Sequence, residues 1–318
     1  MTSTSGPDAN PVPSLRGWFP AFVLLALIWG ASFLLIKVGI RELHPLWLTF
    51  GRVGAGAGAL LLVLLATGTR LPRDPRLWGH LTLIAAVGVA LPFTLFGFGE
   101  QRVSSVLAGI WNATTPLMVL PLAVLVFRTE RFTAPRAAGI GIGFAGVLCV
   151  LGVWRDIGGA QLTGQLMCLG AATCYAVVIP YQKRFVAGHG VAGVSIAAAQ
   201  LLVATVQLGV VAPLLAGPPP SPTRLSGPVL LSVLLLGALG TGFAFVLLYR
   251  IIRIAGASTA SSVTYLMPLV ATLLGVLVLD ERLVWNQPVG ALVVLAGVAV
   301  SQGLFGRRQR AAPELTRT

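Results

Sequence analysis

The sequence predicts an all-α integral membrane protein whose ten transmembrane helices form two inverted five-helix repeats. Three observations lead to this fold: an apolar composition, ten apolar runs of membrane-spanning length, and an echo between the two halves of the chain. Of the 318 residues, 56% are hydrophobic and only 10% are charged, and the mean hydropathy is +0.89. These values exclude an ordinary soluble protein.

The apolar runs of roughly 17 to 25 residues are long enough to cross about 30 Å of hydrocarbon. They lack the strict alternation of a barrel strand, so helices are the spanning structure that satisfies their backbone. The first run is too long for the core of a signal peptide and is expected to be retained. The predicted spans are residues 18–40, 46–66, 77–98, 103–127, 134–153, 163–186, 191–216, 228–250, 256–279 and 287–305.

Basic residues predict the orientation, because cytoplasmic loops carry an excess of Lys and Arg. Of the 22 Lys and Arg residues, 15 fall on the cytoplasmic side if the N-terminus is inside, six fall on the other side, and Arg52 lies within the second span. We therefore expect a multi-pass protein of the cell membrane (inner or plasma membrane) with both termini cytoplasmic. The basic residues are dispersed among short loops, so the net charge of +13 does not indicate a nucleic-acid partner.

The two halves of the chain echo each other. FRTERFTAPRAAGIGIGFAG, residues 127–146, partly matches LDERLVWNQPVGALVVLAG, residues 279–297, and Pro116 aligns with Pro268 at nearly the same offset. Five helices per repeat is an odd number, so the repeats are predicted to lie upside down relative to each other, as in many secondary carriers. The predicted divisions are a cytoplasmic tail (1–17), a first repeat (18–153), a second repeat (163–305) and a basic cytoplasmic tail (306–318).

Several strings in order resemble the EamA family of the drug/metabolite transporter superfamily. They are LIWGASFLLIKVGI, PLWLTFGRVGAGAGALLL and TPLMVLPLAVLVFRTERFT in the first half, and YLMPLVATLLGVLVLDERL and VGALVVLAGVAVS in the second. The resemblance covers nearly the whole chain. It implies a ten-helix inner-membrane carrier, in a family whose members commonly export amino acids or other small metabolites, and it does not specify the substrate.

Two prolines mark the middles of spans four and nine. Pro116 and Pro268 lack the N–H that would bond the carbonyl four residues earlier, so each is predicted to kink its helix. The freed carbonyls belong to Asn112 and Thr264, whose polar side chains are expected to face the bundle interior. These groups either line a substrate cavity or bond each other across a helix interface. Neighbouring residues that would share such a lining are Thr115, Ser261 and Tyr265.

Aromatic and polar residues in other spans are further candidates for substrate contact. Trp29 and Tyr175 are repeat-related and could stack on the apolar part of a substrate, with Ser32 one turn beyond Trp29. Packing in the core is the alternative for each ring. Gln200 lies in the middle of span seven and is expected to face the interior, and Phe93 beside Pro92 is a weaker candidate.

Arg52 is a guanidinium inside a predicted span, which is costly unless it has a partner or reaches water. It lies about six residues from the outer end of span two, so it could snorkel to the interface and anchor the helix. The alternative is a site for an anionic group such as a substrate carboxylate.

All nine acidic residues fall in tails, loops or span ends, so the sequence shows no carboxylate in the middle of the membrane. The related small multidrug carriers exchange protons for cationic drugs through a glutamate in their first helix, whereas this chain has LIWGAS there. The difference favours a neutral or zwitterionic metabolite over a hydrophobic cation.

The predicted function is a secondary transporter that exports a small neutral or zwitterionic metabolite, such as an amino acid, by alternating access. The alternatives are a multidrug efflux carrier, a lipid-carrier flippase and a polytopic membrane enzyme; isolated histidines and the lack of paired carboxylates disfavour the enzyme. Cys149, Cys168 and Cys174 lack metal-ligand spacing, so no metal or other cofactor is expected. Glycines at G54xxxG58 and in GIGIGFAG are expected to allow close helix contacts within a monomer.

Overall fold

The computed structural model describes residues 15–128, 133–152 and 159–301. In this part of the chain the fold is helical throughout. The elements are α1 (Leu15–Gly39), α2 (Pro45–Thr67), α3 (Pro75–Ala85), η1 (Ala86–Ala90), α4 (Leu91–Glu100), α5 (Ser105–Asn112), α6 (Thr115–Leu125), α7 (Ala134–Leu151), α8 (Gly159–Phe185), η2 (Ala187–His189), α9 (Gly193–Ala216), η3 (Pro222–Arg224), α10 (Gly227–Leu234), η4 (Leu235–Phe243), α11 (Ala244–Ser261), η5 (Ser262–Tyr265), α12 (Met267–Leu279) and α13 (Asn286–Ser301).

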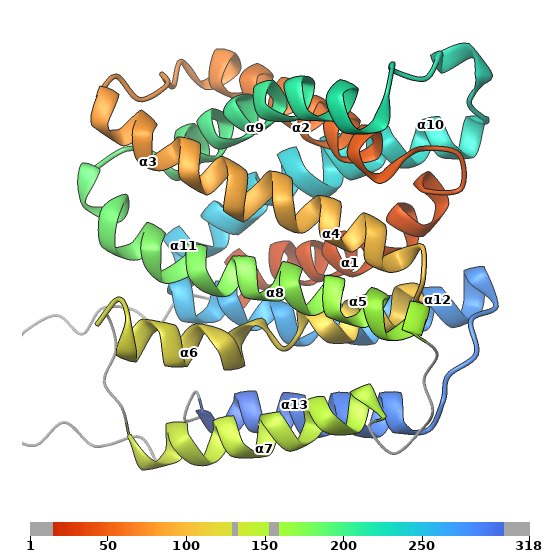
Figure 1. Ribbon diagram of the computed structural model, residues 1–318. Coiled ribbons are helices and arrows are strands. Elements are labelled where there is room, and N and C mark those ends of the chain that lie inside the picture. Colours follow the sequence, from red (N-terminus) through yellow and green to blue (C-terminus); the bar gives the residue numbers. More distant parts are fainter. Residues whose placement is uncertain (1–14, 129–132, 153–158, 302–318) are drawn as a thin grey trace, which may run out of the picture.

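The helices lie side by side in one bundle, and consecutive spans run in opposite directions (Figure 1). The links α1–α2, α4–α5, α9–α10 and α12–α13 lie at one end, on the right in Figure 1, which we call the α1–α2 end. The links α2–α3 and α8–α9 lie at the opposite end, which we call the α2–α3 end.

The described helices agree with the predicted membrane spans. Within these residues, nine helical segments are long and apolar enough to cross a membrane, and the 16-residue apolar helix α13 occupies the place of the tenth. Span eight is longer than predicted. It continues beyond residue 250 to Gly256, whose φ of 86° interrupts α11. These findings confirm a helical membrane protein with nine to ten spans.

The two halves share two irregularities at equivalent places. The third span of each half contains a π-helical segment, η1 in the first half and η4 in the second. The fourth span of each half is divided into two helical segments. The second segment, α6 in the first half and α12 in the second, has a proline as its second residue, Pro116 and Pro268 respectively. A shared pattern of breaks is expected if the halves arose by duplication.

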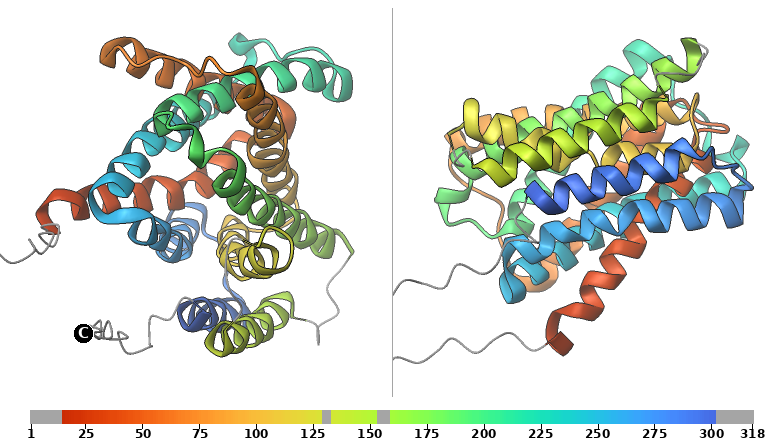
Figure 2. Two further views of the ribbon diagram at one scale, coloured as in Figure 1. Left: turned by 90° about the vertical axis from the view of Figure 1, so that its left-hand side faces the viewer. Right: turned by 90° about the horizontal axis from the view of Figure 1, so that it is seen from below.

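α7 and α13 form a pair set apart from the other helices, seen at the bottom of Figure 2 (left). Glycines on both helices bring the backbones together, as the GIGIGFAG run predicts. A Cβ added to Gly139 would lie 2.6 Å from the carbonyl oxygen of Gly297, and one added to Gly146 would lie 2.9 Å from that of Gly290. In α2, however, the close approach is made to η4 by Gly56, where an added Cβ would lie 3.1 Å from the carbonyl oxygen of Gly237. At the predicted G54xxxG58 pair, a Cβ added to Gly54 would make only an ordinary contact of 3.7 Å, and one added to Gly58 would meet no atom within 4 Å.

Apolar side chains cover both the inside and the outside of the bundle. The largest buried cluster includes Phe33, Phe96 and Trp111, from α1, α4 and α5. Large apolar residues such as Leu65 and Leu214 are at least 70% exposed on the outer faces. An outside this apolar suits hydrocarbon and not water, as expected for a membrane protein.

Candidate functional site

The candidate site centres on Arg52 in α2. Its side chain is only 7% exposed, so it is buried among helices and does not extend to the surface of the bundle. Its Nε–H donates a hydrogen bond of 3.0 Å to Oγ1 of Thr241 in η4. Its guanidinium carbon lies 3.7 Å from the centre of the Phe93 ring in α4. Arg52 therefore connects an element of the second half with two elements of the first.

Close backbone contact between α2 and η4 places Thr241 beside Arg52. A Cβ added to Gly237 would lie 2.7 Å from the carbonyl oxygen of Arg52, and one added to Gly56 would lie 3.1 Å from the carbonyl oxygen of Gly237. Within the π-helical segment, the Thr241 hydroxyl donates to the carbonyl of Leu236, five residues earlier, at 2.9 Å. The Thr241 hydroxyl thus donates to its own helix and accepts from Arg52. Its place in a π-helical segment is also typical of functional positions.

The guanidinium retains binding capacity. Its Nε–H is used by Thr241, while its two terminal amino groups make no hydrogen bond to the residues that the structure describes. Electrostatic neighbours are Tyr175 and Glu100. A planar fork of unused donors in a buried site is the arrangement that recognises a carboxylate through two parallel hydrogen bonds.

Aromatic rings continue from this point towards α1. The Phe96 ring lies 6.4 Å from that of Tyr175 and 5.5 Å from that of Phe33, between ring centroids. Phe93 and Tyr175 were predicted candidates, whereas Phe33 and Phe96 were not. We define the central cluster as Arg52, Phe93, Thr241, Tyr175, Phe96 and Phe33.

Ser32 and Trp29 in α1 flank the central cluster. The Ser32 hydroxyl donates 3.0 Å to the carbonyl of Ile28, and a Cβ added to Gly240 of η4 would lie 3.2 Å from its oxygen. Trp29 packs partly buried against two apolar clusters. Ser32 therefore lies beside Gly240 of η4, the residue that precedes Thr241.

Asn112 and Thr115 lie at the interruption between α5 and α6. The Thr115 hydroxyl donates 2.7 Å to the carbonyl of Asn112, which Pro116 leaves without its helical donor. The Asn112 amide contacts the sulfur of Met267 in α12 at 3.9 Å. The broken helix thus satisfies its own freed carbonyl. Both side chains are buried, and that of Asn112 lies against α12.

The remaining candidates lie in different surroundings. Tyr265 packs against a small apolar cluster that includes Leu117 and Val294, and its hydroxyl has no hydrogen-bond partner among the described residues. Thr264 precedes it in η5, and the side chain of Ser261 lies outside the described residues. Gln200 is buried in α9, which packs against α2, and its amide nitrogen has no described partner. Tyr265 therefore lies in a different apolar cluster from the rings of the central cluster.

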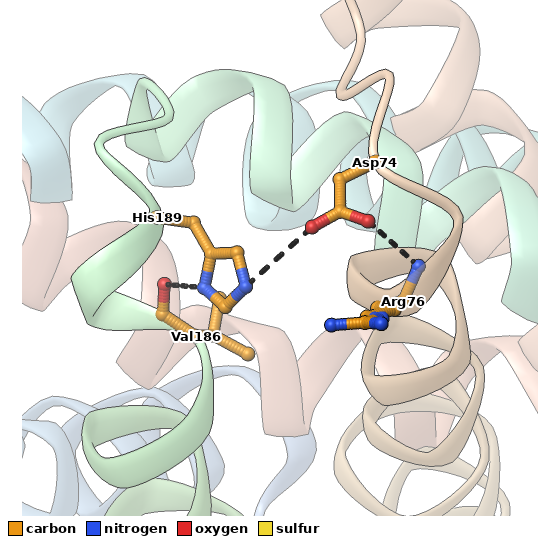
Figure 3. Close-up of polar contacts among 4 residues, drawn as sticks. All are labelled: Asp74, Arg76, Val186 and His189. Carbon is orange, nitrogen blue, oxygen red and sulfur yellow. Dashed lines mark hydrogen bonds and ion pairs between the residues drawn. The ribbon is translucent and has the colours of Figure 1, made fainter.

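Polar contacts tie the helices together at the α2–α3 end. His80 Nδ1 lies 2.7 Å from the Tyr181 hydroxyl, which joins α3 to α8. Nearby, Asp74 accepts 2.9 Å from the backbone N–H of Arg76 at the start of α3, and its other oxygen lies 3.8 Å from Nε2 of His189 (Figure 3). These contacts join the α2–α3 link to the end of α8.

Two further contacts tie the α1–α2 end. The Glu42 carboxylate accepts 2.8 Å from the backbone N–H of Ser226, and this hydrogen bond lowers the pKa of Glu42 below its ordinary value of 4.5. The Glu281 carboxylate accepts from the first backbone N–H groups of α5, those of Ser105 at 2.8 Å and Val106 at 3.1 Å. An anion at a helix N-terminus satisfies unpaired donors and is favoured by the helix dipole.

Among the described residues, no group of three or more His, Cys, Asp or Glu side chains could hold a metal ion. The central cluster offers one buried cation with free donors, a hydroxyl and several aromatic faces, which are groups that can recognise a small molecule. Sequence reasoning missed Thr241, Phe33 and Phe96. The GALGTGF pattern of small residues around Thr241 was the available signal, because small residues permit the close helix approach.

Comparisons with known proteins show similarity to membrane transporters. The sequence model of the EamA-like transporter family matches residues 17–152 and 162–302. The chain is 25% identical over 289 residues to the uncharacterized transporter YoaV of Bacillus subtilis, covering 90% of this chain and 97% of that protein. It is 29% identical over 260 residues to the uncharacterized inner membrane transporter YedA of Escherichia coli, covering 81% of both. One crystal structure superposes with a TM-score of 0.65 at 22% identity, over 92% of this chain and 99% of the other, which shows a shared fold.

Proposed function

Because this chain belongs to the EamA-like transporter family, we propose that it is a secondary carrier that exports a small zwitterionic metabolite, such as a neutral amino acid. Arg52 binds the substrate carboxylate, and the aromatic rings of the central cluster contact its apolar part. Alternating access exposes this site first to one side of the membrane and then to the other.

The observation that carries the proposal is the buried guanidinium of Arg52 with unused donors at a contact between the two halves. Its partner Thr241 belongs to the second half and its stacking partner Phe93 to the first. A substrate held here touches both halves, so relative movement of the halves changes its surroundings. This is the location expected for the substrate of a carrier built from repeats.

The charge of Arg52 also discriminates between substrate classes. A hydrophobic cation in the central cluster would meet a like charge in a low-dielectric site, which costs free energy. A zwitterion or a neutral molecule with a carboxyl or carbonyl oxygen meets hydrogen-bond donors instead. Arg52 therefore favours the metabolite over the multidrug alternative.

The distribution of basic residues supports an orientation of the protein in the membrane. The α2–α3 end carries Arg70, Arg73, Arg76, Arg250 and Arg253, among others, whereas the α1–α2 end is poorer in basic side chains. By the positive-inside rule the α2–α3 end faces the cytoplasm. Export then moves substrate from this end to the α1–α2 end.

The test is exchange transport in liposomes. Purified protein is reconstituted and loaded with each member of a panel of unlabelled amino acids and related metabolites, and counterflow of the labelled compound is measured. We expect counterflow for at least one zwitterion. If no metabolite on the panel exchanges faster than in protein-free liposomes, the proposal is rejected.

Arg52→Gln tests the site, with Arg224→Gln in η3 as a matched control for removal of an exposed arginine. Arg52→Gln removes the charged hydrogen bonds to the substrate carboxylate. The substrate concentration at half-maximal transport should therefore rise about tenfold to hundredfold. Arg52→Lys keeps the charge but loses the planar fork, so an intermediate loss is expected. Asn112→Ala and Tyr265→Ala test the other candidates; unchanged flux in both would remove them from the site and leave Arg52 in place.

A further inference from the structure

Glu100, the last residue of α4, is a buried carboxylate that the proposed substrate site does not use. Its side chain is 0% exposed, and neither carboxyl oxygen has a hydrogen-bond partner among the described residues. Helix α8 closes over it, since a Cβ added to Gly99 would lie 2.6 Å from the sulfur of Cys168. Burial of a charged group without hydrogen-bond donors costs free energy unless a counter-charge lies nearby.

A cavity at the α1–α2 end has Glu100 among its lining residues. Its volume is about 430 Å³, and its wall contains both basic and acidic side chains. The lining residues are Lys37, Ile40, Arg41, Glu100, Gln101, Leu279 and Glu281. Glu100 thus belongs to the wall of this cavity, while its two carboxyl oxygens are buried and lack hydrogen-bond partners among the described residues.

The two acidic residues of this wall differ in their hydrogen bonding. Glu281 accepts from two backbone N–H groups and from the hydroxyl of Ser105 at 3.0 Å, so its charge is satisfied by the start of α5. Glu100 has no such donors. Lys37 lies beside it but donates to backbone carbonyls, that of Glu100 itself and that of Val103 at 2.7 Å.

The charged and titratable groups that act on Glu100 come from four directions. They are Lys37 in α1, Arg52 in α2, Glu281 after α12 and the thiol of Cys168 in α8. Because Lys37 and Arg52 belong to helices that carry the central cluster, the balance of charge around Glu100 depends on how those helices are placed.

The geometry of α1 and α4 connects Glu100 to the substrate site. Phe33 and Lys37 are four residues apart on α1, and Phe96 and Glu100 are four residues apart on α4, so each pair shares a helix face. The two rings contact each other, with centroids 5.5 Å apart. The contact between Lys37 and the Glu100 backbone therefore lies one turn beyond the contact between the rings, and a shift of α1 against α4 alters both.

We propose that Glu100 is the protonation site through which transport is coupled to a proton gradient, an inference that rests on the proposed function. In one arrangement of α1 and α4, Lys37 and Arg52 neutralise the Glu100 carboxylate. In the other, the carboxylate loses these counter-charges and binds one proton. Binding and release of the proton on opposite sides of the membrane then couples the gradient to the conformational change.

Infrared spectroscopy of the detergent-solubilised full chain tests protonation without any substrate. A protonated carboxyl group that has no hydrogen bond gives a high-frequency C=O stretching band, distinct from those of exposed acids. Across a pH series we expect this band to appear and disappear in the wild type and in Glu42→Gln, and to be missing in Glu100→Gln. A band that persists in Glu100→Gln, that disappears only in Glu281→Gln, or that is absent from the wild type would overturn the proposal.

Transport in liposomes tests the coupling. A gradient of about one pH unit stores about 1.4 kcal/mol per proton, which supports about tenfold accumulation of a substrate moved with one proton or against one. We expect the wild type to accumulate the exchanging metabolite when the gradient is applied. In Glu100→Gln we expect equal metabolite concentrations inside and outside the liposomes, with counterflow retained. Accumulation that is equal in both proteins contradicts the inference. Absence of counterflow in the wild type contradicts the proposed function instead, while the infrared result still decides whether Glu100 binds a proton.

Discussion

The Nε–H of Arg52 donates 3.0 Å to the hydroxyl of Thr241, 189 residues later in the chain. Thr241→Val keeps the shape of the side chain and removes the acceptor. The buried guanidinium then loses a charged hydrogen bond, so we expect a destabilisation of about 1.5–3 kcal/mol. The measurement is the apparent Tm of the detergent-solubilised protein.

Thr205→Val in α9 is the matched control for this substitution, because the Thr205 hydroxyl donates only within its own helix, to the carbonyl of Leu201 at 2.7 Å. We expect its Tm to change much less. Equal losses in the two variants would show that the contact with Arg52 adds nothing to stability.

The pairing of α7 with α13 gives a second prediction. A Cβ at Gly139 would lie 2.6 Å from the carbonyl oxygen of Gly297, whereas one at Gly141 has no neighbour within 4 Å. Gly139→Ala should destabilise by about 1–3 kcal/mol through forced separation of the backbones. Gly141→Ala should stabilise by up to about 1 kcal/mol through helix propensity. Thermal unfolding of both variants decides, and destabilisation of similar size in both would contradict the close packing.

The hydrogen bond from Ser226 to Glu42 predicts a pH dependence. The pKa of Glu42 is lower in the folded protein than its ordinary value of 4.5, so the unfolded chain binds a proton more readily. The stabilisation is therefore present above the ordinary pKa and is lost as pH falls through the folded pKa. Glu42→Gln should remove this part of the acid sensitivity, seen as a smaller fall in Tm between neutral and acidic buffer than in the wild type. A fall of the same size in both proteins would contradict it.

Asp74 makes two contacts of unequal strength (Figure 3). One oxygen accepts 2.9 Å from the N–H of Arg76 and caps α3, and the other lies 3.8 Å from the His189 ring. Loss of a helix cap costs about 0.5–2 kcal/mol, whereas an exposed ion pair contributes about 0–1 kcal/mol. Asp74→Ala should therefore lower Tm more than His189→Ala. Because Asp74→Ala removes both contacts and His189→Ala only one, equal losses in the two variants would show that the cap adds nothing to stability.

Much of the fold could be predicted because its causes are local. Hydropathy over some twenty residues identifies a span, and a proline removes one backbone donor wherever it stands, so the interruptions before Pro116 and Pro268 follow from the sequence. The glycines of GIGIGFAG likewise predicted close helix contact, which the structure places between α7 and α13. The choice of Gly56 over Gly54 and Gly58 in α2 could not be predicted, because it depends on which face η4 covers.

By itself, the sequence determined that this is a helical membrane protein with two similar halves, since apolar length, proline positions and repeated strings are properties of the chain alone. Only the tertiary structure decided what surrounds each polar residue. Arg52 could have reached the surface from its position in α2, and Glu100 at the end of α4 could have faced water. Both are instead buried by helices from distant parts of the chain, η4 over Arg52 and α8 over Glu100. The free energy of a buried charge depends on such neighbours, and their identity is set by packing across the whole bundle.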